Sequence, residues 1–272
     1  MIAPIVRQFR EYSCFQRISP IRQIIVCSPL FDNHPKTFFR HRHVSVFLPP
    51  VPCGEPSSTA KFVLVKILAV SDEVVERLYS LSNSGHFNDV ELIIGCGDLP
   101  YPYLENLITF LNIPLMYVPG NHDPNYNPNQ TSAYAEGGSN LDLKLVRFKK
   151  FLIGGLGGCI RYRPDGTNQY TQMEAYTRAF RLLPRLLLNR INFGRALDIL
   201  ITHSPPFGIH DDDTAAHEGL KAINWLIRVA KPRYHFHGHT HFHRRNLSPS
   251  ETVHGLTKII NIFPYKVIEV SH

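Results

Sequence analysis

The sequence predicts an α/β domain built on mixed β-sheets, and three observations support this prediction. Short apolar runs, several of them rich in β-branched residues, alternate with segments of helical periodicity from residue 62 onward. Two adjacent apolar runs joined by Lys149-Lys150 indicate an antiparallel hairpin. Short polar motifs follow several apolar runs directly, and α/β folds place their sites at such strand ends.

The first half of the domain starts with a strand at 62–70, which is apolar apart from Lys66 and therefore expected to be buried on both faces. A helix is expected at 72–81, because Val74, Val75, Leu78 and Leu81 recur near helical spacing and Ser71 or Asp72 can act as the N-cap. A buried strand at 90–94, a helix at 103–111 and a second buried strand at 114–118 are expected next along the chain.

The second half starts with the hairpin, whose strands cover 143–148 and 151–153. A helix at 171–188 follows, and Pro184 should disturb it because proline removes a backbone donor. A strand at 197–201, a helix at 215–230 and a strand at 233–237 come next. The runs 258–263 and 266–270 end the chain, and we expect them to pair antiparallel with each other.

Composition narrows the class of protein. The chain has 272 residues with 43% hydrophobic content, enough for one large domain or two small ones with a proper core. No apolar run approaches the roughly 18 residues of a spanning helix. The apolar stretch at the N-terminus is too short for a signal peptide. Five scattered cysteines without a CxxC pair fit a reducing compartment. We therefore expect a cytoplasmic protein with no membrane partner, although the Arg-rich start weakly resembles an organelle transit peptide.

The net charge of +7 lies mainly outside the part that carries the motifs. Residues 1–61 contain 8 Lys and Arg against 3 Asp and Glu, whereas residues 62–272 contain 21 against 19. The basic balance therefore gives no argument for a nucleic-acid partner of the domain.

Residues 1–60 are predicted to be a poorly ordered extension, because they lack periodicity and end in a Pro-rich stretch. A short strand at 24–27 is the one element expected there. The extension is either dispensable or a mis-assigned start, with natural translation beginning near Val63. Residues 61–272 then form the functional domain.

Four polar motifs follow apolar strands, and all four contain potential metal ligands. They are Gly97-Asp98, Gly120-Asn121-His122-Asp123, Thr202-His203 and Gly238-His239-Thr240-His241. Imidazole is the commonest neutral metal ligand, and the glycine before His239 lets the backbone turn sharply. The pattern is typical of a metal-dependent active site at the strand C-terminal ends.

This ordered set resembles the calcineurin-like metallophosphoesterases. The pattern of that family is Asp-x-His, Gly-Asp, Gly-Asn-His-Asp/Glu, a lone His and Gly-His-x-His, and here Asp72-Glu73-Val74 stands for the first block. The match covers about residues 64–270. The resemblance implies a four-layer sandwich of two mixed β-sheets flanked by helices, and it makes 61–272 a metallophosphoesterase domain.

The resemblance also implies roles for single residues. Asp98 is expected to bridge two divalent cations of Mn²⁺, Fe²⁺ or Zn²⁺, with Asp72 and His241 on the first ion. Asn121, His203 and His239 are expected on the second ion. A metal-bridging hydroxide would attack the phosphorus, with His122 as general acid and Asp123 orienting or tuning that ring.

One position departs from the family pattern, because Val74 replaces the histidine of the first block. Three interpretations follow. Water fills the gap and the first metal binds more weakly, or Cys96 or a histidine substitutes, or the site is mononuclear and weakly active.

Further residues are candidates for substrate binding. Arg161, Arg163 and Tyr170 follow the glycine-rich segment 154–158, and arginine forks suit phosphate oxygens, although an ordinary surface loop fits equally well. His210 is expected to touch substrate or organise its loop, and the neighbouring aspartates 211–213 are expected to form a solvated turn. Histidines 235, 237 and 243 are interpreted as structural or as supports of the ligands.

The predicted function is hydrolysis of a small phosphate ester, with a phosphodiester favoured. A protein Ser/Thr phosphatase is disfavoured, since that branch has Gly-Asp-x-Val-Asp-Arg-Gly and Gly-Asn-His-Glu, whereas here Leu99-Pro100 follows Asp98 and Asp123 replaces the Glu. The alternatives are a catalytically weakened metal-binding interaction protein, and a nuclease that uses the N-terminal arginines. The sequence predicts no particular protein partner or oligomeric state.

Overall fold

The computed structural model describes residues 63–241 and 250–272, which belong to one compact unit spanning Ser58–His272. The expectations for residues 1–60, including the strand at 24–27 and the translation start, lie outside the described residues, as does His243. The first strand is described from Leu64 onward.

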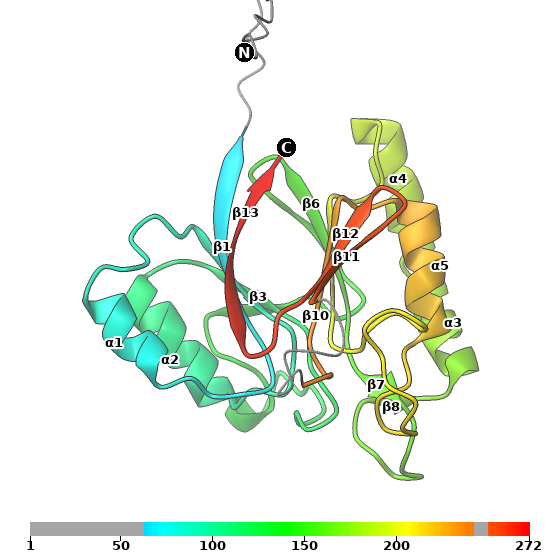
Figure 1. Cartoon of the computed structure of the whole chain (residues 1–272), viewed down its shortest axis with the longest axis horizontal. Helices are drawn as coiled ribbons and strands as arrows, with labels where there is room; N and C mark the ends of the chain where they lie inside the picture. The colour runs from blue at the N-terminus through cyan, green and yellow to red at the C-terminus, as the bar shows by residue number, and fades with distance from the viewer. Residues whose placement is uncertain (1–62, 242–249) are drawn as a thin grey trace, which may run out of the picture. The chain divides into compact units, whose positions relative to one another are not determined.

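Two mixed sheets form the framework (Figure 1). The five-stranded sheet has the order β13-β1-β2-β3-β4, the six-stranded sheet has the order β11-β12-β10-β9-β6-β5, and β7 and β8 form a small ribbon. The strands are β1 Leu64–Val70, β2 Leu92–Gly95, β3 Leu115–Tyr117, β4 Gly138–Asn140, β5 Leu145–Phe148, β6 Phe151–Leu156, β7 Cys159–Ile160, β8 Gln169–Tyr170, β9 Ile199–Thr202, β10 Tyr234–His237, β11 Glu251–His254, β12 Thr257–Asn261 and β13 Tyr265–Ser271.

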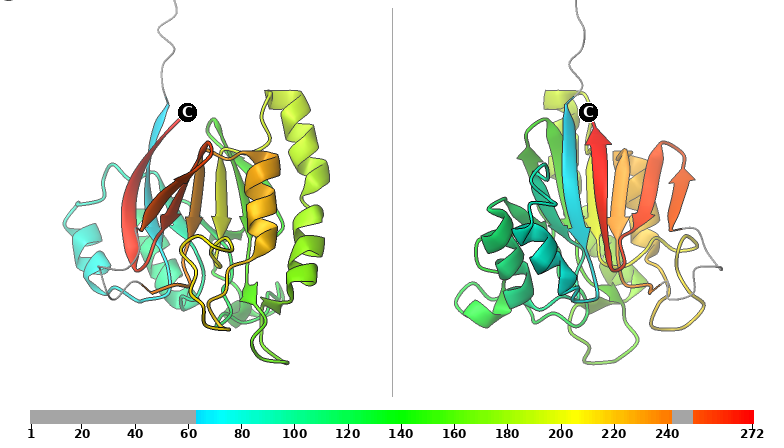
Figure 2. Two further views of the ribbon diagram at one scale, coloured as in Figure 1. Left: turned by 45° about the vertical axis from the view of Figure 1, so that its right-hand side comes forward. Right: turned by 60° about the vertical axis from the view of Figure 1, so that its left-hand side comes forward.

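Helices cover the outer face of each sheet, as the views in Figures 1 and 2 show. Helices α1 and α2 pack on the five-stranded sheet, and α3, α4 and α5 pack on the six-stranded sheet. Their bounds are α1 Arg77–Asn83, α2 Tyr101–Leu111, α3 Gln172–Phe180, α4 Leu183–Phe193 and α5 Lys221–Ala230, with a 3-10 turn at Thr131–Ala133.

Three apolar cores separate these layers. In β1, Ile67 and Ala69 join the core between the sheets, whereas Leu68 and Val70 join the core under α1 and α2. This alternation follows from the two-residue side-chain period of a strand and explains why β1 is apolar on both faces. The arrangement confirms the predicted four-layer sandwich of two mixed sheets flanked by helices.

The expected antiparallel pairing of the last two strands is wrong. β12 pairs parallel with β10 and antiparallel with β11 in the six-stranded sheet, while β13 pairs antiparallel with β1 over seven positions in the other sheet. The chain changes sheets around Phe263 because Ile260 and Val270 bury in the same inter-sheet core from opposite sides. Each of the two strands therefore satisfies its backbone groups in a different sheet.

The bounds of all four predicted helices also differ from the prediction, α2 only in beginning at Tyr101 rather than at 103. Helix α1 begins at Arg77 rather than at 72, because Asp72 has a φ of 65°, which a right-handed helix excludes. The helix at 171–188 is divided into α3 and α4, with Pro184 in the first turn of α4, where its missing N–H costs no hydrogen bond. Helix α5 begins at Lys221, because the preceding residues form a loop over the strand ends.

The prediction found the hairpin of β5 and β6 but missed β4, the β7–β8 ribbon and β11. The missed strands have two to four residues, too few to show a period. In the part of the chain that the structure describes, no helix combines the length and the apolar character that crossing a membrane would require.

Candidate metal centre

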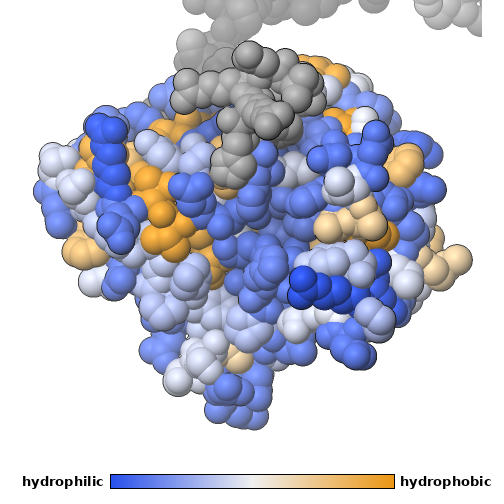
Figure 3. Space-filling model, turned by 60° about the horizontal axis from the view of Figure 1, so that its bottom comes forward, coloured by the Kyte–Doolittle hydropathy of each residue, from blue (hydrophilic) through white to orange (hydrophobic). Residues whose placement is uncertain are grey.

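The predicted ligands lie in loops that follow five parallel or mixed-sheet strands at one edge of the sandwich. Asp72 follows β1, Asp98 follows β2, Asn121 follows β3, His203 follows β9 and His239 follows β10. Because these strands run in the same direction, their carboxyl ends meet at this edge. Figure 3 views the molecule from this end, and hydrophilic residues occupy much of the visible face.

The backbone is forced into a rare conformation at three of these ligands. Asp72, Asp98 and His239 have φ values of 65°, 56° and 67°, although none of them is glycine. Such left-handed conformations cost about 1–3 kcal/mol each and are concentrated at functional sites. At these positions the chain turns directly after the strand, so the side chain projects back toward the centre.

Two glycines of the motifs are required by close contacts rather than by flexibility. A Cβ atom on Gly120 would overlap the carboxylate of Asp98, and a Cβ on Gly238 would overlap Ser71 Oγ and the carboxylate of Asp72. The two motif glycines therefore let neighbouring loops touch at the cluster of ligands.

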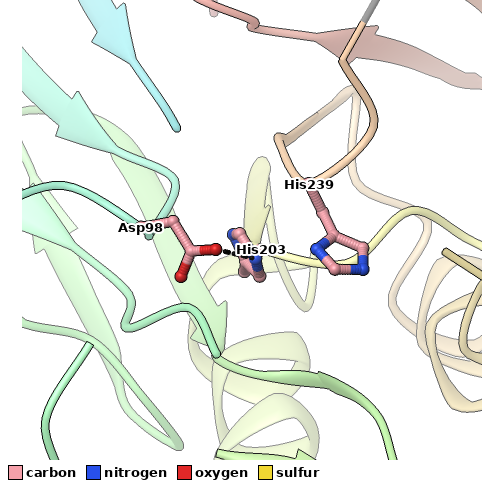
Figure 4. A group of neighbouring side chains, drawn as sticks. All are labelled: Asp98, His203 and His239. Carbon is pink, nitrogen blue, oxygen red and sulfur yellow. Dashed lines mark ion pairs between the residues drawn. The ribbon is translucent and has the colours of Figure 1, made fainter. Parts of the chain in front are cut away.

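Asp98, His203 and His239 form a group whose ligand atoms all lie within 4.8 Å of one another (Figure 4). His203 Nε2 is 3.3 Å from Asp98 Oδ2 and 3.1 Å from Asn121 Oδ1. Four side chains from four loops thus lie around His203 Nε2 or within 4.8 Å of it.

The hydrogen bonds of the two histidines turn their lone pairs toward that point. His203 Nδ1 donates to the carbonyl of Cys96 at 2.8 Å, and His239 Nε2 donates to the carbonyl of Ala216 at 2.7 Å. A carbonyl oxygen only accepts, so these nitrogens carry the protons and His203 Nε2 and His239 Nδ1 keep their lone pairs in the neutral rings. Metal-binding histidines are oriented in this way in most proteins.

The electrostatics describe a place for positive charge. Burial opposes ionisation of Asp98, but the adjacent His203 outweighs it and lowers the pKa of Asp98 to about 2. Burial likewise opposes protonation of His203, yet Asp98 raises the pKa of His203 to about 9. For His239, burial and the charge of His203 lower the pKa to about 3, so this ring is neutral. The residues therefore fit a cation. A cation can replace the proton that His203 otherwise holds between Asp98 and Asn121.

The second part of the predicted centre is formed by Asp72 and His241. Asp72 Oδ1 lies 3.4 Å from His241 Nε2, and both oxygens of Asp72 accept from the backbone N–H of His239, at 3.1 and 3.0 Å. The hydrogen bond that the His241 ring donates to Asp72 raises the pKa of His241, which also stacks on Phe263 with 4.6 Å between ring centroids. Asp72 thereby connects the two halves of the ligand set.

The structure places Val74 in the segment between β1 and α1, where its side chain is 40% exposed. Cys96 lies in the apolar core between the sheets, and burial raises the pKa of its thiol well above the usual value. Because the thiolate is the form that binds metal, this environment does not suit Cys96 as a replacement for the missing histidine.

His122 and Asp123 have different surroundings. The His122 side chain is 70% exposed, its backbone N–H donates to Asp98 Oδ1 at 2.8 Å, and its Nε2 lies 3.9 Å from Asp98 Oδ2. Asp123 Oδ2 accepts from the N–H groups of Asp98 and Gly120, at 2.9 and 2.8 Å. Burial raises the pKa of Asp123 to about 6. Asp123 therefore fastens two ligand loops together through their backbones.

Two cavities border His122. The first has a volume of about 720 Å³ and the second about 670 Å³, and both are lined by His122, Asp123 and Pro124. The first is completed by α2 residues including Glu105 and by residues 131, 132 and 136, and the second by the loop 162–167 with Asn121 and Gln169.

Of the residues predicted to bind substrate, only Arg163 lines one of these cavities. Arg161 instead forms an ion pair with Glu174 at 2.9 Å. Tyr170 lies beneath the guanidinium of Arg178, 4.0 Å from the ring centroid. Both therefore have structural partners within the domain.

His210 is buried, and its two ring nitrogens lie 2.9 Å from His237 Nε2 and 2.8 Å from Thr252 Oγ1. Asp211 Oδ2 accepts from the backbone N–H groups of Gly208 and Gly219. These contacts shape the loop that carries Ala216, whose carbonyl orients His239. Of the two predicted roles for His210, the contacts support organisation of the loop.

Sequence reasoning missed two residues that hold the Asn121 loop. Tyr162 Oη accepts from Asn121 Nδ2 at 3.2 Å, and Asn168 Nδ2 donates to the carbonyls of Gly120 and Asp123 at 2.9 and 3.1 Å. Because Tyr162 receives the amide N–H₂ of Asn121, the amide oxygen faces His203. The sequence signal for Tyr162 is the segment Arg161-Tyr162-Arg163, of which the prediction names only the arginines as site residues.

Comparisons with known proteins agree with this architecture. The family model described as Calcineurin-like phosphoesterase matches residues 65–243. One solved crystal structure aligns with a TM-score of 0.51 at 14% identity, covering 76% of this chain and 99% of the other, and this level of identity shows the fold alone. The protein TT1561 of Thermus thermophilus aligns with a TM-score of 0.48 at 17% identity, covering 74% and 89%. NAD nucleotidase (NadN) of Haemophilus influenzae aligns with a TM-score of 0.42 at 11% identity, covering 78% and 53%. No curated protein sequence matches the chain.

The clamp formed by Asp123 can be tested with two substitutions. Asp123→Ala leaves two buried backbone donors without an acceptor, which costs about 1–3 kcal/mol each, so the melting temperature should fall by several degrees. Asp123→Asn retains an oxygen that can accept both bonds and should stay close to wild type. Equal losses of stability and activity in the two variants would indicate that the negative charge, rather than the clamp, is required.

The contact between Tyr162 and Asn121 predicts an effect on metal affinity. Tyr162→Phe removes the hydroxyl that orients the amide, and loss of such a supporting contact lowers metal affinity roughly 10-fold or more. Isothermal titration with Mn²⁺ measures the change, and Tyr126→Phe, at an exposed tyrosine, is the matched control. Unchanged affinity in Tyr162→Phe would show that the loop holds Asn121 without it.

Proposed function

The chain belongs to the calcineurin-like phosphoesterase family, and from this premise we propose that it is a metal-dependent hydrolase of small phosphodiesters. Membership of the family indicates metal-dependent hydrolysis of a phosphoester. The preference for a diester and the roles of single residues are our proposal. The observation that carries it is the convergence of Asp98, Asn121, His203 and His239 on one point.

The residues that would hold the metal ions follow from the direction of their lone pairs. Asp98 would bridge two divalent ions, with Asn121, His203 and His239 on one ion and Asp72 and His241 on the other. Carboxylate, amide and imidazole ligands suit Mn²⁺, Fe²⁺ and Zn²⁺ alike. When bound, such a pair of ions polarises a phosphoryl group and lowers the pKa of coordinated water.

His122 is the residue suited to deliver a proton to the leaving group. Its backbone N–H is fixed on Asp98, while its ring is exposed and extends over the cluster between the two cavities. A substrate phosphorus held at the cluster would bring its leaving oxygen within reach of this ring. Proton donation at that oxygen lets the leaving group depart as an alcohol rather than as a strongly basic alkoxide.

The two cavities support a diester over a monoester. A phosphodiester carries two substituents on the phosphorus, and two cavities of about 720 and 670 Å³ both border His122. A monoester would fill only one of them. Arg163, whose guanidinium lies 5.4 Å from the ring centroid of Tyr162, lines the second cavity and could pair with an anionic or planar group of the substrate.

Hydrolysis of phosphate esters with Mn²⁺ tests this function directly. The wild type should hydrolyse bis(p-nitrophenyl) phosphate faster than p-nitrophenyl phosphate. His122→Ala should lower kcat by about 100-fold or more for a dinucleoside phosphate, whose leaving group is an alkoxide, and by less for p-nitrophenolate, which needs little protonation. Mn²⁺ binding should persist in His122→Ala and be lost in Asp98→Asn. Equal activity of all three proteins would place the reaction elsewhere.

The alternative of a metal-binding protein without turnover rests on Val74. Val74→His should restore the family ligand and increase the affinity for the more weakly bound Mn²⁺, which calorimetric titration detects as a tighter second equilibrium. Glu73→His, at the adjacent exposed position, is the control for an added histidine. If Val74→His leaves stoichiometry and affinity unchanged, the missing ligand is not what limits the first ion.

A further inference from the structure

Helix α4 is apolar on its solvent side as well as on its core side. Its core side contributes Leu186, which is 2% exposed. On the opposite side, Pro184, Leu187, Leu188 and Ile191 recur at the i, i+3, i+4, i+7 spacing of one helical stripe, and the last three side chains are 49%, 55% and 80% exposed. An apolar stripe that faces solvent has no role in the packing of the domain itself.

Exposed apolar side chains are concentrated around this stripe. Six of the fourteen large hydrophobic side chains that are exposed among the described residues lie on α3 and α4. They are Met173, Phe180, Leu187, Leu188, Ile191 and Phe193. Single exposed hydrophobics are ordinary, but Leu187, Leu188 and Ile191 share one stripe of α4, and such a group marks an interaction surface.

The segment that carries the stripe is basic. Residues 175–197 contain five arginines and neither Asp nor Glu, and two of the five, Arg178 and Arg195, are paired with Asp142 and Asp198. On the helical projection of α4, Arg185 borders the stripe on one side and Arg190 borders it on the other. Arg181 precedes the helix, and all three arginines are exposed. Arginine stems can lie along an apolar surface while their guanidinium groups stay in a polar layer.

We propose that this α4 face, formed by Pro184, Leu187, Leu188 and Ile191 with the flanking arginines, docks on an anionic lipid surface. An apolar stripe bordered by basic residues is the layout of helices that lie in the plane of a membrane interface. The apolar side chains would enter the boundary between headgroups and acyl chains, and the arginines would pair with anionic headgroups. Such peripheral binding requires no spanning helix.

Charge argues against a second copy of the chain as the occupant. A two-fold contact would place the arginines of one α4 face against those of the other, and like charges across an interface are unfavourable. A single helix of 11 residues also offers less area than the roughly 800 Å² per partner of a standard protein interface. A lipid surface adapts its shape to a short convex stripe, and its charge is opposite.

The position of α4 leaves the metal centre accessible. The carboxyl end of α4 leads directly into the amino end of β9, whereas the proposed ligand His203 follows the carboxyl end of the same strand. The stripe and the cluster of ligands therefore belong to opposite ends of the six-stranded sheet. Binding to lipid and hydrolysis of a water-soluble ester can be measured independently.

Cosedimentation of the full-length chain with vesicles tests the proposal. The protein should bind vesicles of phosphatidylcholine with 30% phosphatidylserine, a composition chosen for the assay, and bind pure phosphatidylcholine weakly. The double variant Leu188→Ser and Ile191→Ser changes no charge and should weaken binding about 10-fold or more, because two apolar side chains no longer enter the lipid. Both side chains are exposed, so the melting temperature should be unchanged.

The matched control is Val253→Ser with Leu256→Ser, which replaces two equally exposed apolar residues on β11 and the following turn. This variant should bind vesicles like the wild type. Unchanged binding of the α4 variant would assign the attraction to other basic segments, such as residues 1–61, and overturn the proposal. Absence of binding to phosphatidylserine vesicles would also overturn it, as would self-association that the α4 variant abolishes.

Discussion

The structure of the site depends on one constraint: oxygen and nitrogen atoms with lone pairs, from four separate loops, meet at one point that requires positive charge. Asp98 Oδ2 and Asn121 Oδ1 both approach His203 Nε2, whose ring is fixed by the carbonyl of Cys96. Acceptors at such distances repel one another unless positive charge lies between them. The raised pKa of His203 shows how the chain alone supplies that charge, by keeping a proton there.

Much of the surrounding structure keeps these acceptors from separating. Positive φ values turn Asp72, Asp98 and His239 back toward the centre, and Gly120 and Gly238 allow their loops to touch. These conformations are unfavourable for isolated peptides, so the two sheets must impose them. The parallel strands do so by ending at one edge, with their backbone groups satisfied before the chain turns.

The ligands could be predicted from sequence because each stands in a short motif directly after a strand, and strand direction fixes where the motif lies. Asp98 and His239 needed no knowledge of distant contacts. Tyr162 and the clamp role of Asp123 did, because their function comes from atoms of loops that meet only in the folded chain. The pairing of β13 was missed for the same reason, since a strand pattern states that a strand exists and not which sheet it joins. Likewise, the helix predicted over 171–188 gave no indication that the outer apolar stripe of α4 faces solvent.

Valine at position 74 changes the coordination of the proposed first ion but not the charge around it. A coordinating histidine is neutral, so valine at this position removes a lone pair and leaves the charge of the ligand set unchanged. The two carboxylates that offset the cations, Asp72 and Asp98, are present and held by backbone donors. Since Val74 is 40% exposed, water can reach the position that a histidine ring would occupy. We therefore expect the first ion to be held by the same electrostatic attraction with one more exchangeable ligand, which weakens its binding without preventing it.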